Sequence, residues 1–135
     1  MPAPLDFRMQ ILVLPGATEV HAIVSVTATG DAPAEPETAL WIEPEPGASV
    51  RFLRQTRPSR AEIRPIDGAY RTGSWAAEER EFHLCLDMPA LADGRKRMVA
   101  VVFLLRPEDH VLAEGTVLAG RDDGFVAPPP PLPRG

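Results

Sequence analysis

The sequence predicts an all-β fold, an antiparallel immunoglobulin-like β-sandwich of about 7-8 strands, followed by a disordered proline-rich C-terminal tail. Three observations support this prediction. Apolar residues recur with period two along most of the chain, which is the side-chain period of a strand. Turn signals recur roughly every ten residues, as in sandwiches. The 135 residues also include 16 prolines, which disfavour a helical bundle because proline removes a backbone donor and clashes inside helices.

The length fits one domain, because chains divide into several cores only beyond about 250 residues. We expect residues 1–124 to form the sandwich and residues 125–135 to form the tail. Five of the last eight residues are proline, so extended polyproline II is the expected local state. Such a run can dock in an aromatic groove of a proline-recognition module, but a flexible terminus is our interpretation.

The first two expected strands form a hairpin. Residues 7–13 alternate apolar and polar side chains and end at a Pro-Gly pair, and residues 20–28 alternate in the same way. The second strand is rich in valine and threonine, which suit a half-buried pleated surface. Residues 14–19 are the expected connection.

The middle of the chain is predicted from weaker signals. Residues 31–38 lack any large apolar side chain and contain two prolines, so we expect a linker there. Strand character resumes in residues 40–42 and 50–55, and residues 44–47 have the composition of a tight turn.

A short helical turn is predicted after Arg57-Pro58. Ser59 and Glu62 have the spacing of a capping box, in which each side chain satisfies a free backbone amide of the other. Asp67-Gly68 then signals a turn, and Tyr70 to Trp75 is expected to be a strand.

The strongest strand signals come late in the chain. Arg80 to Met88 alternates inward Phe82, Leu84 and Leu86 with polar residues. Residues 98–105 are apolar on both faces, which predicts a central strand. Residues 111–118 form the last expected strand.

Composition excludes several function classes. The chain has 14 basic and 19 acidic residues and a formal net charge of −5, so nucleic acid and anionic membrane surfaces are not expected partners. The longest apolar stretch is far shorter than the roughly 20 residues that cross a bilayer, and the N-terminus lacks the pattern of a secretory signal. A cytoplasmic location is therefore expected.

The residues most suggestive of chemistry lie on one face of the strand that starts at Arg80. Glu81, His83, Cys85 and Asp87 alternate there, at about 6.5–7 Å between successive side chains. His83 could bind a metal together with Cys85 or Asp87. The alternative, which we favour, is an ordinary strand face with Cys85 as a small filler, because His21 and His110 are distant in sequence. We therefore expect no metal and no cofactor.

Catalytic motifs are absent from the sequence. The chain has no nucleophile elbow, phosphate loop or dinucleotide fingerprint. Strand geometry also holds His83 and Cys85 too far apart for the activation of a cysteine nucleophile, which needs contact at about 3 Å. We expect that the protein is not an enzyme. Trp41 and Trp75 are the candidates for contact with a partner, although tryptophans in small β-domains more often fill the core or a sheet edge, which is the alternative we favour.

Several segments together resemble a known family. Residues 19–30 resemble the strand that precedes the von Willebrand factor A (VWA) domain in a group of actinobacterial VWA-domain proteins. Residues 40–44, 50–55, 73–75 and 80–89 resemble the β-rich region that follows that domain. The resemblance covers about Asp6 to Gly124.

The resemblance carries one clear departure. A VWA domain binds a divalent cation through an Asp-x-Ser-x-Ser motif, and this chain has no such motif. Residues 31–38 stand at the position of the missing VWA domain. If a domain was once inserted there, Thr29 and Leu40 should be near neighbours, because insertions are tolerated where entry and exit points lie close together.

Three hypotheses for function follow. The first is a non-enzymatic protein–protein interaction or scaffold module related to the regions that flank VWA domains, with an unidentified protein partner. The second is a small metal- or ligand-binding protein that uses the face of Glu81, His83, Cys85 and Asp87. The third is a structural remnant, or a form from which a domain was deleted, without independent activity. The oligomeric state stays open.

Overall fold

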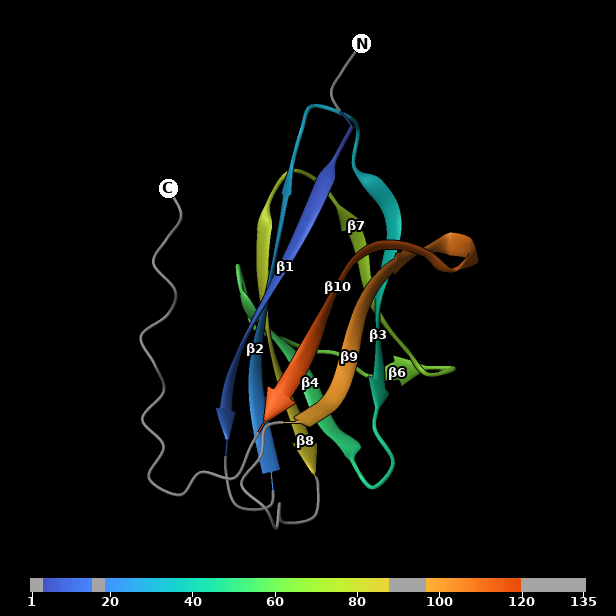
Figure 1. Cartoon of the computed structure of the whole chain (residues 1–135). Coiled ribbons are helices and arrows are strands. Elements are labelled where there is room, and N and C mark those ends of the chain that lie inside the picture. Colours follow the sequence, from blue (N-terminus) through green and yellow to red (C-terminus); the bar gives the residue numbers. More distant parts are fainter. Residues whose placement is uncertain (1–3, 16–18, 88–96, 120–135) are drawn as a thin grey trace.

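The structure is a computed structural model that describes residues 4–15, 19–87 and 97–119 (Figure 1). The described residues form two antiparallel sheets. Sheet A has the order β1-β2-β8-β4-β5 and sheet B the order β10-β9-β3-β7-β6. The strands of sheet A are β1 (Asp6–Pro15), β2 (Glu19–Thr29), β8 (Glu79–Asp87), β4 (Ser49–Arg57) and β5 (Ala61–Glu62). Those of sheet B are β10 (His110–Ala119), β9 (Arg97–Arg106), β3 (Glu35–Pro44), β7 (Ala69–Trp75) and β6 (Pro65–Ile66).

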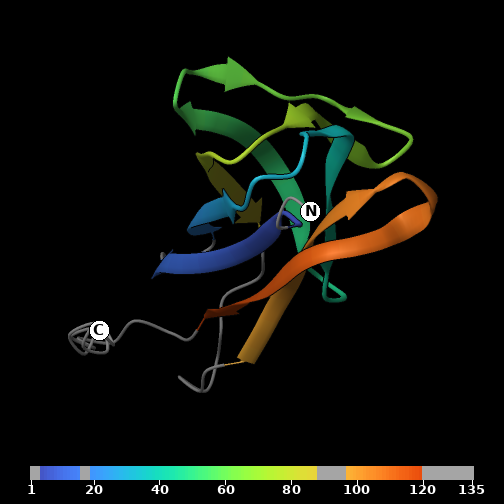
Figure 2. The ribbon, with the colours of Figure 1, turned by 90° about the horizontal axis from the view of Figure 1, so that it is seen from above.

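The all-β antiparallel sandwich is confirmed. The two sheets form two layers (Figures 1 and 2), and the one helical segment in the described part of the chain is η1, a 3-10 turn at Pro107–Asp109. The described residues contain ten strands, more than predicted, because β5 and β6 have two residues each and are too short to produce an alternating pattern. The immunoglobulin-like description stays a prediction.

The core lies between the inward faces of the two sheets. Phe82, Leu84 and Leu86 of β8 are fully buried, as their alternation predicted. Sheet B contributes Leu40, Val102 and Leu104. Burial of each such side chain stabilises the fold by about 1.5–3 kcal/mol relative to its exposure to water.

The hairpin of the first two strands is confirmed. β1 pairs with β2 from Asp6 opposite Thr29 to Pro15 opposite Val20. β9 is an internal strand, as predicted, because it lies between β10 and β3. The edge strands β1 and β10 run side by side in both views, and a methyl group placed on Gly115 of β10 would lie 2.8 Å from the Cδ1 atom of Ile11 (Figures 1 and 2). The two sheets therefore close on each other along this side.

The prediction of a linker over residues 31–38 is wrong at its C-terminal end. β3 begins at Glu35, and Thr38 is buried with 4% of its surface exposed. Its hydroxyl donates to the Gly73 carbonyl oxygen at 2.7 Å and lies 2.6 Å from the Thr72 hydroxyl. Pairing with β7 thus forms a strand in a segment that has no large apolar residue.

The connection between the sheets is therefore short. Thr29 is the last residue of β2 in sheet A, whereas Leu40 lies inside β3 in sheet B. Residues 30–34 alone join the two strands, so an insertion between β2 and β3 would lie there and not as far along as Leu40.

The predicted helical turn at residues 59–62 is also wrong. Ala61–Glu62 is strand β5, which pairs with Gln55 and Arg54 of β4. The side-chain amide of Gln55 donates to the Ser59 carbonyl oxygen at 2.9 Å. This bond, together with the strand pairing, satisfies backbone groups that a helical turn would have used.

The predicted tight turn lies one residue later than expected, at residues 45–48, where the Ala48 backbone N–H donates to the Glu45 carbonyl oxygen at 2.9 Å. It does not close a hairpin, because β3 and β4 belong to different sheets. Within the ranges that the structure describes, no helix is long and apolar enough to cross a membrane. The predicted tail, residues 125–135, and the predicted end of the sandwich at residue 124 lie outside the described residues.

Trp75 is a core residue, which is the placement that its residue type favoured, and not a candidate for surface contact. Its side chain is 0% exposed, and its ring meets Phe7 edge-on at a centroid distance of 5.9 Å. The indole N–H donates to the Glu78 carbonyl oxygen at 3.2 Å. The Arg80 guanidinium lies 4.5 Å from the ring centroid and donates to the Thr72 and Ser74 carbonyl oxygens.

We expect Trp75→Ala to lower the free energy of unfolding by about 3–5 kcal/mol, because it leaves a cavity between the sheets. Trp41→Ala is the matched control, since Trp41 is only partly buried. Urea unfolding followed by circular dichroism measures both losses. Equal losses would contradict the placement of the two rings.

We also expect Gly30→Ala to destabilise the sandwich. Gly30 has φ +133, a conformation that is essentially restricted to glycine, and an added Cβ would collide with the Pro4 carbonyl oxygen. Gly73→Ala is the control, because Gly73 also has positive φ but no heavy atom lies within 4 Å of an added Cβ. Backbone strain should cost each variant about 1–3 kcal/mol, and Gly30→Ala should lose more. A smaller loss for Gly30→Ala in urea unfolding would refute the collision.

Candidate functional site

The pairing of β2 with β8 brings together residues that are far apart in the sequence. His21 lies directly opposite Cys85, and Ile23 lies opposite His83. Directly opposite residues of an antiparallel pair have Cβ atoms about 4.5–5.5 Å apart. The outer face of sheet A therefore carries a compact group made of Glu19, His21, His83 and Cys85, which we call the His21 cluster.

Short contacts connect the members of the His21 cluster. His21 Nε2 lies 2.9 Å from Glu19 Oε1, and His21 Nδ1 lies 2.8 Å from His83 Nε2. The sulfur of Cys85 lies 4.0 Å from His21 Nε2. His21 is thus the centre of the cluster, with a neighbour at each ring nitrogen.

An arginine from the next strand holds the acidic side of the cluster. Arg51 of β4 donates from one terminal nitrogen to Glu19 Oε2 at 2.9 Å and from Nε to Asp87 Oδ2 at 3.2 Å. Arg51 therefore fixes one oxygen of Glu19 and leaves Oε1 directed to His21. Asp87 pairs with Arg51 instead of joining the histidines.

The surroundings shift the pKa values of three members. The hydrogen bond from His21 and the charges of His21 and Arg51 lower the pKa of the Glu19 carboxyl. Burial lowers the pKa of His83, and the positive charges of His21 and Arg54 lower it further. Burial raises the pKa of the Cys85 thiol, as do the negative charges of Glu19 and Asp87. Cys85 and His83 are therefore neutral near pH 7, while Glu19 is ionised.

The structure changes the set of site residues that the sequence suggested. Of Glu81, His83, Cys85 and Asp87, only His83 and Cys85 belong to the cluster. Glu81 accepts a hydrogen bond from the Thr56 hydroxyl at 2.8 Å and lies on another part of the sheet. His110 is on β10 of sheet B, where its Nε2 atom lies 3.9 Å from Glu108 Oε1.

Sequence reasoning missed Glu19 and His21. The alternation in residues 20–28 places His21 on the outward face of its strand, but nothing in the sequence says which strand is the neighbour. Cys85 was expected to be a partly buried filler, and it is 0% exposed. Phe52 of β4 lies opposite Cys85 on its other side, so the thiol has a neighbouring strand on both sides.

A second feature is the outer face of sheet B, where four strands carry apolar side chains among polar ones. Glu114 lies opposite Phe103, and Glu43 lies opposite Val101. β9 alternates buried core residues with partly exposed Val101, Phe103 and Leu105. Trp41 of β3 lies opposite Phe103. We call this surface the sheet B apolar face; its members are Ala39, Trp41, Ala69, Met98, Val101, Phe103, Leu105, Val111 and Leu118.

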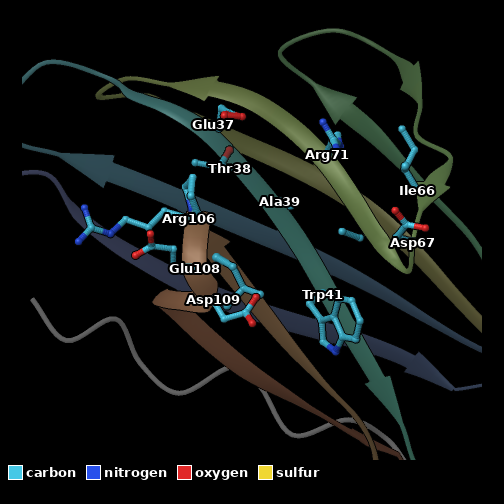
Figure 3. A pocket seen from close by; sticks show the side chains of 13 residues that line it. Glu37, Thr38, Ala39, Trp41, Ile66, Asp67, Arg71, Arg106, Glu108 and Asp109 are labelled. Carbon is cyan, nitrogen blue, oxygen red and sulfur yellow. The ribbon is translucent and has the colours of Figure 1, made fainter.

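A hollow of about 390 Å³ lies beside the sheet B apolar face (Figure 3). Trp41, Ala39, Leu105 and Ile66 supply its apolar lining, and Ile66 is 51% exposed. Four acidic and two basic side chains also line it: Glu37, Asp67, Glu108, Asp109, Arg71 and Arg106. The hollow therefore combines an aromatic ring with a net negative charge.

Comparisons with known proteins give one informative match. No family model and no curated protein matches the chain. A solved structure named von Willebrand factor type A from Catenulispora acidiphila is similar, with a TM-score of 0.58 and 30% sequence identity. The match covers 65% of this chain and 24% of that protein, so this chain spans about a quarter of its length. The fold is thus related to part of a VWA-type protein from an actinobacterium.

Proposed function

We propose that this protein is a non-enzymatic interaction module that docks a partner protein on the sheet B apolar face. The observation that carries the proposal is the composition of that face. A sheet face that meets water normally carries polar side chains in alternation with the buried ones. Here Val101, Phe103 and Leu105 occupy the positions where β9 would carry polar residues. Polar residues of the neighbouring strands, such as Glu43 and Glu114, border these side chains, and exposed apolar surface with a polar border marks interaction sites.

Trp41 is the proposed anchor of this contact. It lies opposite Phe103 and also lines the hollow. Buried tryptophans at the centre of an interface contribute much of the binding energy. The acidic lining of the hollow suits a basic side chain of the partner, which could lie against the indole ring in a cation–π contact.

We further propose that the partner is a VWA-type domain. The similar protein is VWA-type, yet the described residues of this chain form two antiparallel sheets and no α-helix. A VWA domain is a doubly wound α/β sheet. The match itself shows a related fold, and the flanking-region hypothesis adds that the matched quarter of that protein is a β-rich region beside its VWA domain. Residues 30–34 would mark the place of the insertion.

We further propose that the protein acts in the cytoplasm. Cys85 is a free thiol, and reduced cysteines are typical of that compartment. The hypothesis of a small metal-binding protein has its own support in the His21 cluster, which uses residues other than the sheet B apolar face.

The test is a binding titration of the purified chain with the separately produced VWA portion of the Catenulispora acidiphila protein. We expect the double variant Trp41→Ser/Phe103→Ser to weaken binding by about 30-fold or more, because each of the two substitutions removes an apolar anchor. Leu12→Ser/Leu14→Ser is the matched control, since these leucines are 61% and 51% exposed on sheet A, and it should bind as the parent does.

Two results would contradict the proposal. Equal weakening by the two double variants would show that the contact does not use the sheet B apolar face. Absence of binding by the parent chain would leave the remnant hypothesis in its place. Circular dichroism of every variant confirms that the sandwich is folded.

A further inference from the structure

We propose that Glu19, His21 and Cys85 form a binding site for a divalent metal ion of the zinc class. One carboxylate oxygen, one ring nitrogen and the thiol sulfur all lie within 4.8 Å of one another. These three donors come from two neighbouring strands, β2 and β8, that are paired from Glu19 opposite Asp87 to Thr27 opposite Glu79. The site is therefore built on rigid elements and is independent of the sheet B apolar face.

The donor set fits zinc chemistry. Zinc binds thiolate sulfur at about 2.3 Å, imidazole nitrogen at about 2.0–2.1 Å and carboxylate oxygen at about 2.0–2.2 Å, usually with tetrahedral geometry. Those bond lengths require the ligand atoms to lie about 3.3–3.6 Å apart. The observed separations of 2.9 Å from His21 Nε2 to Glu19 Oε1 and 4.0 Å to Cys85 Sγ bracket this range. Shifts of about half an ångström would bring these two separations into that range, and the Glu19 oxygen and the Cys85 sulfur lie within 4.8 Å of each other.

Two neighbours hold the ligands in the required orientation. A ligating histidine almost always has a hydrogen-bond partner at its other ring nitrogen. His83 Nε2 lies 2.8 Å from His21 Nδ1, so His21 can donate from Nδ1 while Nε2 binds the ion. Arg51 donates to Glu19 Oε2 and leaves the other oxygen for the metal. His83 and Arg51 are positioning residues.

Charge also favours a divalent ion. Glu19, Asp87 and the thiolate of Cys85 would carry three negative charges, and Arg51, which is bonded to both carboxylates, supplies one positive charge, so two negative charges are left to balance the ion. Binding would replace the thiol proton of Cys85 by the metal, and that proton would pass to solvent. The side chains of His21 and Glu19 are 31% and 37% exposed, so a water molecule could occupy the fourth position.

The experiment is a titration of the full metal-free chain with Co²⁺, a spectroscopic probe for zinc sites, followed by competition with Zn²⁺. We expect one equivalent of Co²⁺ to bind with a thiolate-to-metal charge-transfer band, and Zn²⁺ to remove that band. Cys85→Ser should abolish the band. His21→Gln and Glu19→Gln should each weaken binding by about 100-fold, because each removes one of three protein ligands.

His83→Gln tests the positioning role. We expect it to keep the charge-transfer band and to weaken metal affinity by about 10–100-fold, as changes in residues that hydrogen-bond to metal ligands do. His110→Gln is the matched control, since His110 is an exposed histidine on sheet B, and it should bind Co²⁺ as the parent does.

The outcomes separate a metal site from a group of hydrogen bonds. Absence of the charge-transfer band in the parent chain would overturn the proposal, and so would equal weakening by His110→Gln. Cys85→Ser alters a buried residue and could unfold the chain, so Glu19→Gln, at a half-exposed position, provides the second test. Circular dichroism without metal shows whether each variant is folded. Failure of this test leaves the binding test of the sheet B apolar face unaffected.

Discussion

The register between β2 and β8 is the constraint on which the rest of the structure depends. Val20 lies opposite Leu86, Ala22 opposite Leu84 and Val24 opposite Phe82, and all six side chains are at most 2% exposed. A slip of one residue would turn one strand's apolar set outward. The core therefore fixes this register, and the same register places the outward residues of the two strands side by side. The His21 cluster is a consequence of core packing.

Period-two alternation explains why much of this fold could be predicted from the sequence. The inward residues of β8 and the hairpin of β1 and β2 follow directly from it. Residues 35–38 could not be predicted in this way, because Thr38 is held by hydrogen bonds to β7 and not by apolar contact. Its partners, Thr72 and Gly73, are distant in sequence, so only the folded chain reveals the strand.

Only two of the four residues of the His21 cluster, His83 and Cys85, could be predicted from the sequence, because alternation does not show which strands are neighbours. Alternation alone places His83 and Cys85 on one outward face, and it places Glu19 and His21 on another. Which two faces meet depends on the order of the strands in the sheet, and β2 and β8 are separated by nearly fifty residues of chain. Trp75 shows another limit, because residue type favoured the core for both tryptophans, while only the folded chain shows that Trp75 packs against Phe7 and that Trp41 stays partly exposed.

The two outer faces carry different chemistry, and the fold keeps them apart. An ion at the His21 cluster would join β2 to β8, which are already neighbours in sheet A, so it would stabilise the folded state by mass action without moving a strand. The sheet B apolar face is built on β9 and β3, on the far side of the core. Metal binding should therefore raise the free energy of unfolding and leave the affinity for a docked partner unchanged. Coupling between the His21 cluster and the sheet B apolar face would require the core itself to shift.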